Sequence, residues 1–155
     1  MCCKADKKLT KRYQKRPKAF AAWKVRRRNY RGLVSPRHDL KTGGCFDGPG
    51  RVTSTRSLGR WRKDQGDLVY AGNHWFVSKK DAEAEMHRTI AREGGAHLVV
   101  RVMVDPAEVI AVGDLWLDDG RMSAARWERA DGRILTGVST AVELLPQDWK
   151  KAMGN

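Results

Sequence analysis

Basic side chains recur along the first part of the chain in a pattern suited to contact with phosphate. Lys24, Arg26 and Arg28 occupy every second position of one segment, and aromatic residues are interleaved with the basic ones. Cationic groups neutralise phosphates, and exposed aromatic rings stack on unpaired bases. The predicted nucleic-acid-binding residues are Lys24, Arg26, Arg28, Tyr30, Arg31, Arg56, Arg60, Trp61 and Arg62.

The charge of the whole chain is unevenly distributed along the sequence, with the positive charge concentrated in its first part. Residues 1–63 hold 20 of the 31 Lys and Arg and three acidic residues, a net charge of +17. Residues 64–155 hold 11 basic and 15 acidic residues, a net charge of −4. Such a separation creates a positive field over one part of the molecule, and RNA, DNA or a nucleoprotein is its commonest partner. No known readout motif accompanies it, so the sequence predicts binding without a specific module.

The residue types that hold metals or act as nucleophiles are scattered along the chain. The three cysteines have no C-x-x-C spacing, and the four histidines form no H-x-x-x-H or H-E-x-x-H pattern. From these residues we expect no metal site and no cofactor. Metal-free cleavage of RNA would need two histidines as acid and base, and His38 and His74 are the pair that a fold would have to bring together.

Three short motifs stand in the order used by the Arg–Ser–Glu ADP-ribosyltransferases. They are Tyr30-Arg31-Gly32, Thr53-Ser54-Thr55 and Glu83-Ala84-Glu85. The chain resembles that family in these motifs, which implies an alternative function as an NAD-dependent ADP-ribosyltransferase. The resemblance implies that Arg31 and Ser54 hold NAD and that Glu85 orients the ribose. The other interpretation of these carboxylates is a solvated first turn of a helix, where negative charge is favourable.

A second resemblance covers about residues 20–115. The chain combines a Trp-Lys-Val strand, a Ser-Pro turn, a His-aromatic-Phe strand before an Asp-Ala helix, and the run V-D-P-x-x-V-I-A-V-G. In this combination it is similar to small uncharacterised accessory proteins of tailed phages. The resemblance implies an accessory or host-directed role in the host cytoplasm, where a small basic protein binds or inhibits a host nucleoprotein.

These residues need a scaffold, and the sequence predicts one α+β domain over residues 19–155. Period-two alternation predicts a strand from Phe20 to Arg26, and short apolar runs predict strands at 73–77, 97–104 and 108–112. Ser78 is a helix N-cap signal, so one main helix is expected at about 78–93. Turn residues between short apolar runs predict a C-terminal β-meander from Leu115 to Leu145, and a short terminal helix follows at 146–153. The expected fold is one mixed or antiparallel sheet with one main helix.

Residues 1–18 carry many charges and no apolar periodicity, which is typical of a disordered basic tail. No run approaches the roughly 20 apolar residues of a membrane span. The basic N-terminus also lacks the apolar region of a signal peptide. The sequence therefore predicts a cytoplasmic protein that does not bind membranes, and it leaves the oligomeric state open.

Overall fold

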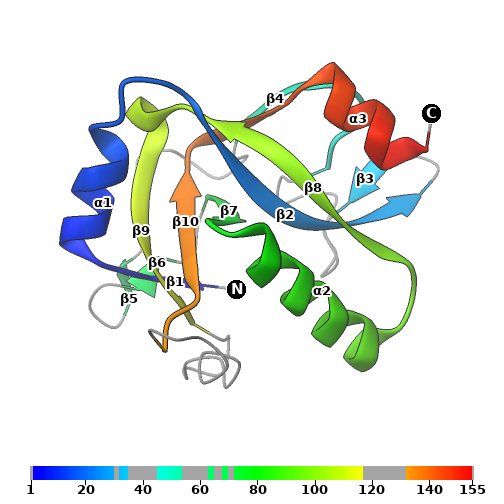
Figure 1. The fold of residues 1–155 in the computed structure, drawn as a ribbon, viewed down its shortest axis with the longest axis horizontal. Helices are drawn as coiled ribbons and strands as arrows, with labels where there is room; N and C mark the ends of the chain where they lie inside the picture. Colours follow the sequence, from blue (N-terminus) through cyan, green and yellow to red (C-terminus); the bar gives the residue numbers. More distant parts are fainter. Residues whose placement is uncertain are drawn as a thin grey trace.

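Antiparallel strands joined in one sheet form the centre of the fold, and the helices pack on its outside (Figure 1). The computed structural model describes residues 2–29, 32–34, 45–53, 63–64, 68–69, 72–116 and 132–154. The strand order is β4 (Gly50–Thr53), β11 (Ala141–Leu144), β8 (His97–Val104), β2 (Phe20–Asn29), β7 (Asn73–Phe76), β10 (Leu135–Ser139), β9 (Val109–Trp116), β1 (Cys2–Ala5), β6 (Leu68–Val69) and β5 (Lys63–Asp64), with β3 (Gly32–Val34) paired to β2.

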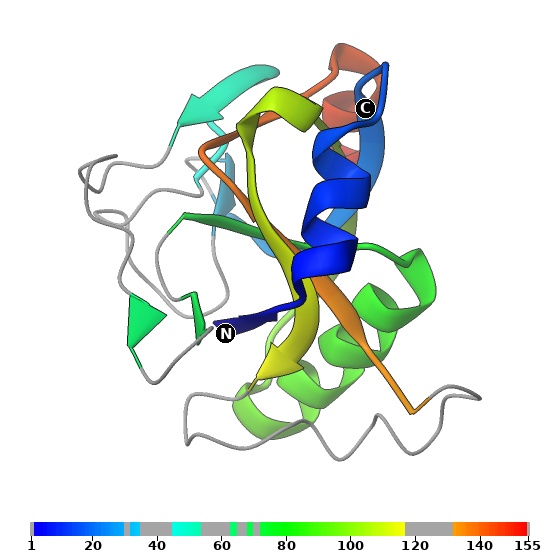
Figure 2. The same cartoon turned by 90° about the vertical axis from the view of Figure 1, so that its left-hand side faces the viewer.

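Three α-helices and one short 3₁₀ helix accompany the sheet in the described part of the chain. They are α1 (Lys7–Gln14), α2 (Lys79–Glu93), α3 (Pro146–Met153) and η1 (Pro106–Glu108). Helix α1 contacts β9 and η1, α2 contacts β2 and β8, and α3 contacts β8. Figure 2 shows α1 lying along the outside of β9, and Figure 1 shows α3 on the opposite side of the molecule.

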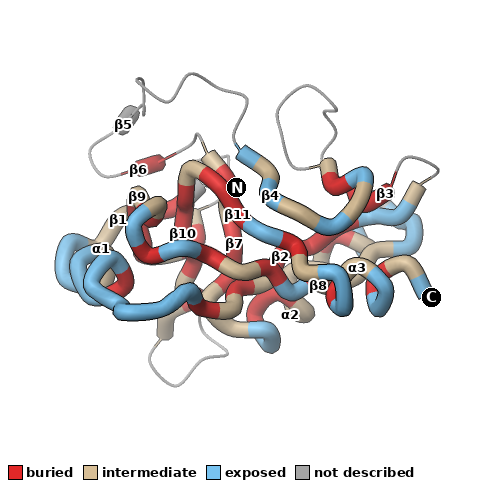
Figure 3. Tube along the Cα trace, turned by 90° about the horizontal axis from the view of Figure 1, so that it is seen from above, coloured by how far each residue is buried: buried red, intermediate tan, exposed pale blue. Residues whose placement is uncertain are grey.

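The longest pairing joins β2 to β8, from Phe20 opposite Val104 to Arg27 opposite His97. One face of this pair carries Ala22 and Val102 into the main core, which also contains Tyr13 of α1. The other face carries Val25 into a second cluster beneath α2. Figure 3 shows that the buried residues concentrate in these central strands, whereas α1 is exposed along its outer side. Both faces of β2 are therefore covered.

Several predicted elements are confirmed. The protein is α+β with a mostly antiparallel sheet, and the predicted main helix is α2. Ser78 is its N-cap, with its hydroxyl oxygen accepting a hydrogen bond from the Asp81 backbone N–H at 3.5 Å. Strand β8 and helix α3 have the predicted bounds.

The prediction of a disordered tail over residues 1–18 is not confirmed, and α2 is not the only helix in the described residues. Residues 2–5 form β1, which pairs with both β9 and β6, and residues 7–14 form α1. The apolar signal in this segment is short, because only Leu9 and Tyr13 of α1, at i and i+4, and Cys3 and Ala5 of β1 reach the core. Leu9 and Tyr13 each cover part of a sheet that would otherwise be exposed.

The predicted meander is only partly correct. Strands expected at 108–112 and at Leu115 onward are one continuous strand, β9, which pairs with β10. Strand β11 does not return to β10 but pairs with β4 and β8, because the register shifts at Val138/Ser139 and the chain then crosses to the other end of the sheet. Residues 117–131 of the predicted meander lie outside the described residues.

Trp75 on β7 is the largest fully buried side chain among the described residues and fills the centre of the main core. Its indole N–H donates to the Ser139 hydroxyl at 3.1 Å, and its ring meets the edge of Phe20 at 5.5 Å between centroids. Gly137 lies opposite Trp75 in the β10–β7 register. A Cβ atom at position 137 would lie 2.1 Å from Trp75 Cη2, so the indole requires glycine there.

We expect Gly137→Ala to lower the free energy of unfolding by about 3 kcal/mol, because the indole would have to leave its position in a close-packed core. Urea unfolding followed by tryptophan fluorescence measures the change. Gly48→Ala is the control, since no atom lies within 4 Å of a Cβ there. An equal loss in both variants would contradict this account of Gly137.

Candidate functional site

Helix α1 is attached to β9 through side-chain hydrogen bonds. The Asp6 carboxylate caps the helix by accepting the Leu9 backbone N–H at 3.1 Å. The Thr10 hydroxyl donates to the Val112 carbonyl at 3.2 Å and accepts the Val112 N–H at 3.0 Å. Gln14 Nε2 donates to the Val109 carbonyl at 2.9 Å. These contacts fix which side of the helix faces solvent.

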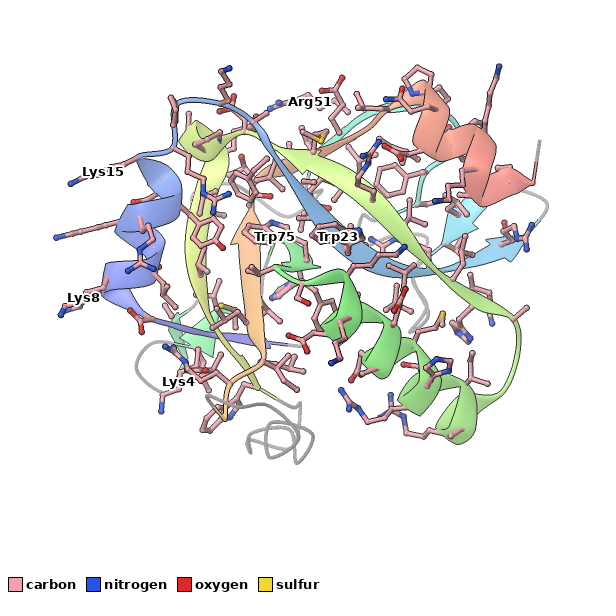
Figure 4. All side chains as sticks on the ribbon, viewed as in Figure 1. Lys4, Lys8, Lys15, Trp23, Arg51 and Trp75 are labelled. Carbon is pink, nitrogen blue, oxygen red and sulfur yellow. The ribbon has the colours of Figure 1, made fainter. Side chains whose placement is uncertain are left out.

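The solvent side of this segment is a dense array of cations, which we name the α1 cationic surface. It consists of the exposed residues Lys4, Lys7, Lys8, Lys11, Arg12, Lys15, Arg16 and Lys18. Figure 4 labels Lys8 and Lys15, which point away from the body of the protein along α1, and Lys4 on β1, whose ammonium lies 4.7 Å from the centroid of the Trp116 ring. These eight residues account for all of the Lys and Arg in residues 2–18.

Asp6 is the one acidic residue in residues 2–18, and its carboxylate is paired with Arg133 and with the Leu9 backbone N–H. Its pKa is lowered by the hydrogen bond from the Leu9 N–H and by Arg133, whose Nη2 lies 3.1 Å from the carboxylate. Arg133 also forms an ion pair with Asp114 at 2.9 Å. These two carboxylates therefore balance Arg133 rather than the lysines of α1.

The placement of these cations opposes the stability of the helix. Lys7 and Lys8 stand in the first turn, which has no acidic residue, although the helix dipole favours negative charge there. Lys7 and Lys11 are like charges at i and i+4, as are Lys8 and Arg12, and each such pair costs about 0.2–0.5 kcal/mol. The attachment to β9 offsets this cost.

Two of the predicted phosphate contacts need correction. Lys24 and Arg26 were expected on an exposed face of a half-buried strand, but their side chains are only 3% and 7% exposed. The alternation along β2 is present, but neither face of the strand is exposed to solvent at these positions. The main core lies against one face, and α2 contacts the other.

The remaining predicted contacts are not gathered with α1. Arg28 is exposed but lies eight residues beyond Phe20 on β2, about 26 Å along the strand. Its guanidinium approaches the end of α3, since a Cβ at Gly154 would lie 3.5 Å from Nη1. The other predicted residues, Tyr30, Arg31, Arg56, Arg60, Trp61 and Arg62, lie outside the described residues.

Lys24 belongs to a buried polar cluster that links strands. Its ammonium or amine nitrogen donates to the His74 carbonyl at 2.8 Å and to Asn73 Oδ1 at 3.5 Å. The Asn73 amide nitrogen in turn donates to the carbonyls of Val52 and Thr140, both at 3.3 Å. Because β2 and β7 share a single register pair, Trp23 with Phe76, these side-chain bonds supply connections that the backbone lacks there.

Burial controls the ionisation of this cluster. Desolvation, followed by the charge of Arg26, holds the pKa of Lys24 well below its usual value. Desolvation also lowers the pKa of His74 to about 4, and the Lys24 charge acts in the same direction. The pKa of Arg26 falls to about 10 by desolvation, so its guanidinium stays charged at neutral pH and lies 5.8 Å from the Phe46 ring centroid.

The structure does not place Glu85 where the ADP-ribosyltransferase resemblance requires it. Glu85 lies within α2, and its carboxylate accepts two hydrogen bonds from Arg88, at 2.8 and 3.0 Å. Arg31 and Ser54, the expected NAD contacts, lie outside the described residues, as does His38. His74 has both ring nitrogens within 3.3 Å of the backbone carbonyls of Val69 and Gly72, so it acts as a structural residue.

Two further findings concern metal ligands and membrane-spanning helices. Within the described ranges, no group of three or more His, Cys, Asp or Glu side chains is arranged to hold a metal ion. Each helix in those ranges is too short or too polar to span a membrane.

Comparisons with known proteins add no relatives. No protein-family model matches the chain, and neither the curated proteins nor the solved structures contain a match. The fold and the α1 cationic surface therefore define the protein only as an antiparallel α+β protein with a helix-borne basic face.

Sequence reasoning missed most of this face, because residues 1–18 were expected to be disordered. The signal was present in three features of the segment. Asp6 precedes Lys7 as an N-cap residue, Leu9 and Tyr13 share one face, and Thr10 and Gln14 lie beside them on the same side. Every basic residue between Lys7 and Lys15 falls outside that face.

We expect the stability of the protein to fall between pH 6.5 and pH 4 through His74. The folded state keeps the imidazole neutral down to about pH 4, whereas the unfolded chain binds its proton near 6.5. The contribution is complete above pH 6.5 and is lost on acidification, and it amounts to at most about 3 kcal/mol.

Urea unfolding at pH 7, 5.5 and 4 measures this dependence. The His74→Gln variant should lose the His74 part of the slope, while His87→Gln, at an exposed position on α2, should keep it. If both variants retained the same slope as the original protein, the account of His74 would be wrong.

Proposed function

We propose that this protein binds nucleic acid, bare or within a nucleoprotein, through the α1 cationic surface. Lysine and arginine side chains neutralise backbone phosphates and release the counterions condensed on them, which provides most of the affinity of sequence-independent binding. Residues 4–18 carry eight cations and one carboxylate, a net charge of +7 over a single exposed face.

One observation carries the proposal: the positive charges are held on one side of a helix whose other side is fixed to the sheet. A disordered tail would have to be ordered on binding, with a loss of conformational entropy. The hydrogen bonds of Thr10 and Gln14 to β9 fix the array in advance. The like-charge pairs in α1 lower its own stability, which favours a role in binding an anion over a structural one.

Exposed lysines elsewhere have a different setting. Lys79 on α2 lies 3.8 Å from Glu83 at i+4, an ordinary surface ion pair. Lys150 and Lys151 occupy the last turn of α3, where cations complement the helix dipole, as Lys11 and Arg12 do in α1. In these cases helix stability is sufficient to explain the charge. Helix α1 differs at its first turn, where Lys7 and Lys8 oppose the dipole. The NAD-dependent alternative lacks comparable support, because Glu85 is paired with Arg88 inside α2.

The test removes three charges from α1 and compares the result with three charges removed elsewhere. We expect Lys7→Gln/Lys11→Gln/Lys15→Gln to weaken binding to a fluorescent oligonucleotide at least tenfold at low salt. The slope of log K against log salt should decrease in magnitude by about 3, one unit for each lysine that no longer neutralises a phosphate. Fluorescence anisotropy over a salt series measures both quantities.

The matched control is Lys80→Gln/Lys150→Gln/Lys151→Gln, which changes the net charge equally at exposed positions on α2 and α3. It should keep nearly the original slope. Equal effects of the two triple variants would mean that only net charge matters, and an unchanged slope in the α1 variant would exclude this surface as the site.

A further inference from the structure

A polar hollow of about 430 Å³ opens where α1 leads into β2. The residues that line it come from the end of α1 and the following turn, from η1, and from the facing parts of β4 and β11. Gln14 and Arg16 lie on either side of Lys15, so the hollow adjoins the α1 cationic surface. In Figure 4, Lys15 and Arg51 lie at the same upper edge of the molecule.

The charges in this hollow differ from those of α1. Its lining contains two arginines, Arg16 and Arg51, and three carboxylates, Asp105, Glu108 and Glu143, a net charge of −1. Arg51 is already bound to Glu108 in a bidentate ion pair, with Nη2 2.6 Å from Oε2. A phosphate is therefore not favoured inside the hollow, whereas a neutral group that both donates and accepts hydrogen bonds fits it.

Arg16 provides a planar platform at the hollow. Its guanidinium carbon lies 4.2 Å from the Tyr13 ring centroid and 5.0 Å from that of Phe20, and both rings are buried in the core. Arg16 itself is exposed. An exposed guanidinium that lies over aromatic rings is one of the planar groups on which nucleobases stack.

We infer that the nucleic acid is single-stranded and that one of its bases stacks on Arg16 and enters this hollow while the phosphates follow α1. This inference rests on the proposed function. In a duplex the bases are paired and stacked on one another, whereas a single strand can turn a base outward. Glu143 then accepts a hydrogen bond from the exocyclic amine of the base, as carboxylates do with cytosine N4. Glu108 is held by Arg51, and Asp105 Oδ1 accepts the Ala107 N–H.

The base type follows from the same chemistry. Glu143 is exposed on β11, and its partner in the β11–β4 register is Arg51. A carboxylate accepts hydrogen bonds and donates none when ionised, so cytosine is favoured over thymine or uracil, which carry no exocyclic amine. Cytosine and uracil have the same ring size and differ at position 4, where cytosine carries the amine, and in the hydrogen on N3, so a comparison of their homopolymers tests this edge of the base.

The test measures binding of 12-mers of cytosine and of thymine or uracil, as DNA and as RNA, together with a DNA duplex of the same length at the same salt. The single-stranded cytosine oligomer should bind most tightly, and either sugar satisfies the inference. Arg16→Lys keeps the charge but removes the planar stacking surface. It should weaken single-strand binding about tenfold, leave duplex binding unchanged, and preserve the salt slope.

Arg27→Lys is the matched control, an equal exchange at an exposed position on β2 outside both the α1 cationic surface and the hollow, and it should have little effect. Glu143→Gln should bring cytosine and thymine affinities together. A rise in affinity for both oligomers alike would show instead that Glu143 only repels phosphate, and this would overturn the inference.

Equal effects of Arg16→Lys and Arg27→Lys, or a duplex that binds as tightly as the single strand, would also overturn it. Those results would not change the slope of log K against log salt that the α1 lysines determine. They are therefore distinct from a failure of the proposed function, which the triple variant of Lys7, Lys11 and Lys15 tests.

Discussion

The attachment of α1 to β9 is the interaction on which the position of the basic face depends. Val112 on β9 forms three hydrogen bonds with residues at the start of the chain. Its carbonyl accepts from the Asp6 N–H and the Thr10 hydroxyl, and its own N–H donates to the Thr10 hydroxyl. Glycine at the neighbouring position, Gly113, allows this approach, because a Cβ there would lie 1.8 Å from the Lys4 carbonyl oxygen. The close contact between β1 and β9 thus fixes both the strand and the helix that follows it.

In the same part of the molecule, buried aromatic rings also support a charged side chain at the surface. Tyr13 belongs to the main core, yet its ring also supports the Arg16 guanidinium at the surface. Phe20 extends this arrangement to the first residue of β2, and Trp75 continues it into the interior. A line of aromatic rings therefore runs from the central core to the edge of the basic face, and packing deep in the protein holds a surface cation in place.

The sequence was sufficient for the elements with strong local signals. Helix α2 has a clear N-cap and terminal glycines, and β8 has four valines within an alternating run. Strand partners were less accessible, since the crossing of β11 to β8 and β4 depends on contacts among residues far apart in the chain. Helix α1 was missed because its eight residues have only two apolar anchors, and the remaining stabilisation comes from β9. Lys24 and Arg26 were misplaced because charge alone does not reveal that both faces of a strand are covered.

Two pairs of neighbouring strands, β2 with β7 and β11 with β8, share a single register pair each, and the boundary between β2 and β7 separates two groups of strands. One group contains β7, β10, β9 and β1 with α1, and the other contains β2, β8, β11 and β4 with α3. Partial opening of a protein follows its weakest boundary, and backbone amides on the two sides then exchange with solvent as separate cooperative units. Separation at this boundary would leave α1 docked on its own group of strands, so the basic face would outlast the first stage of unfolding.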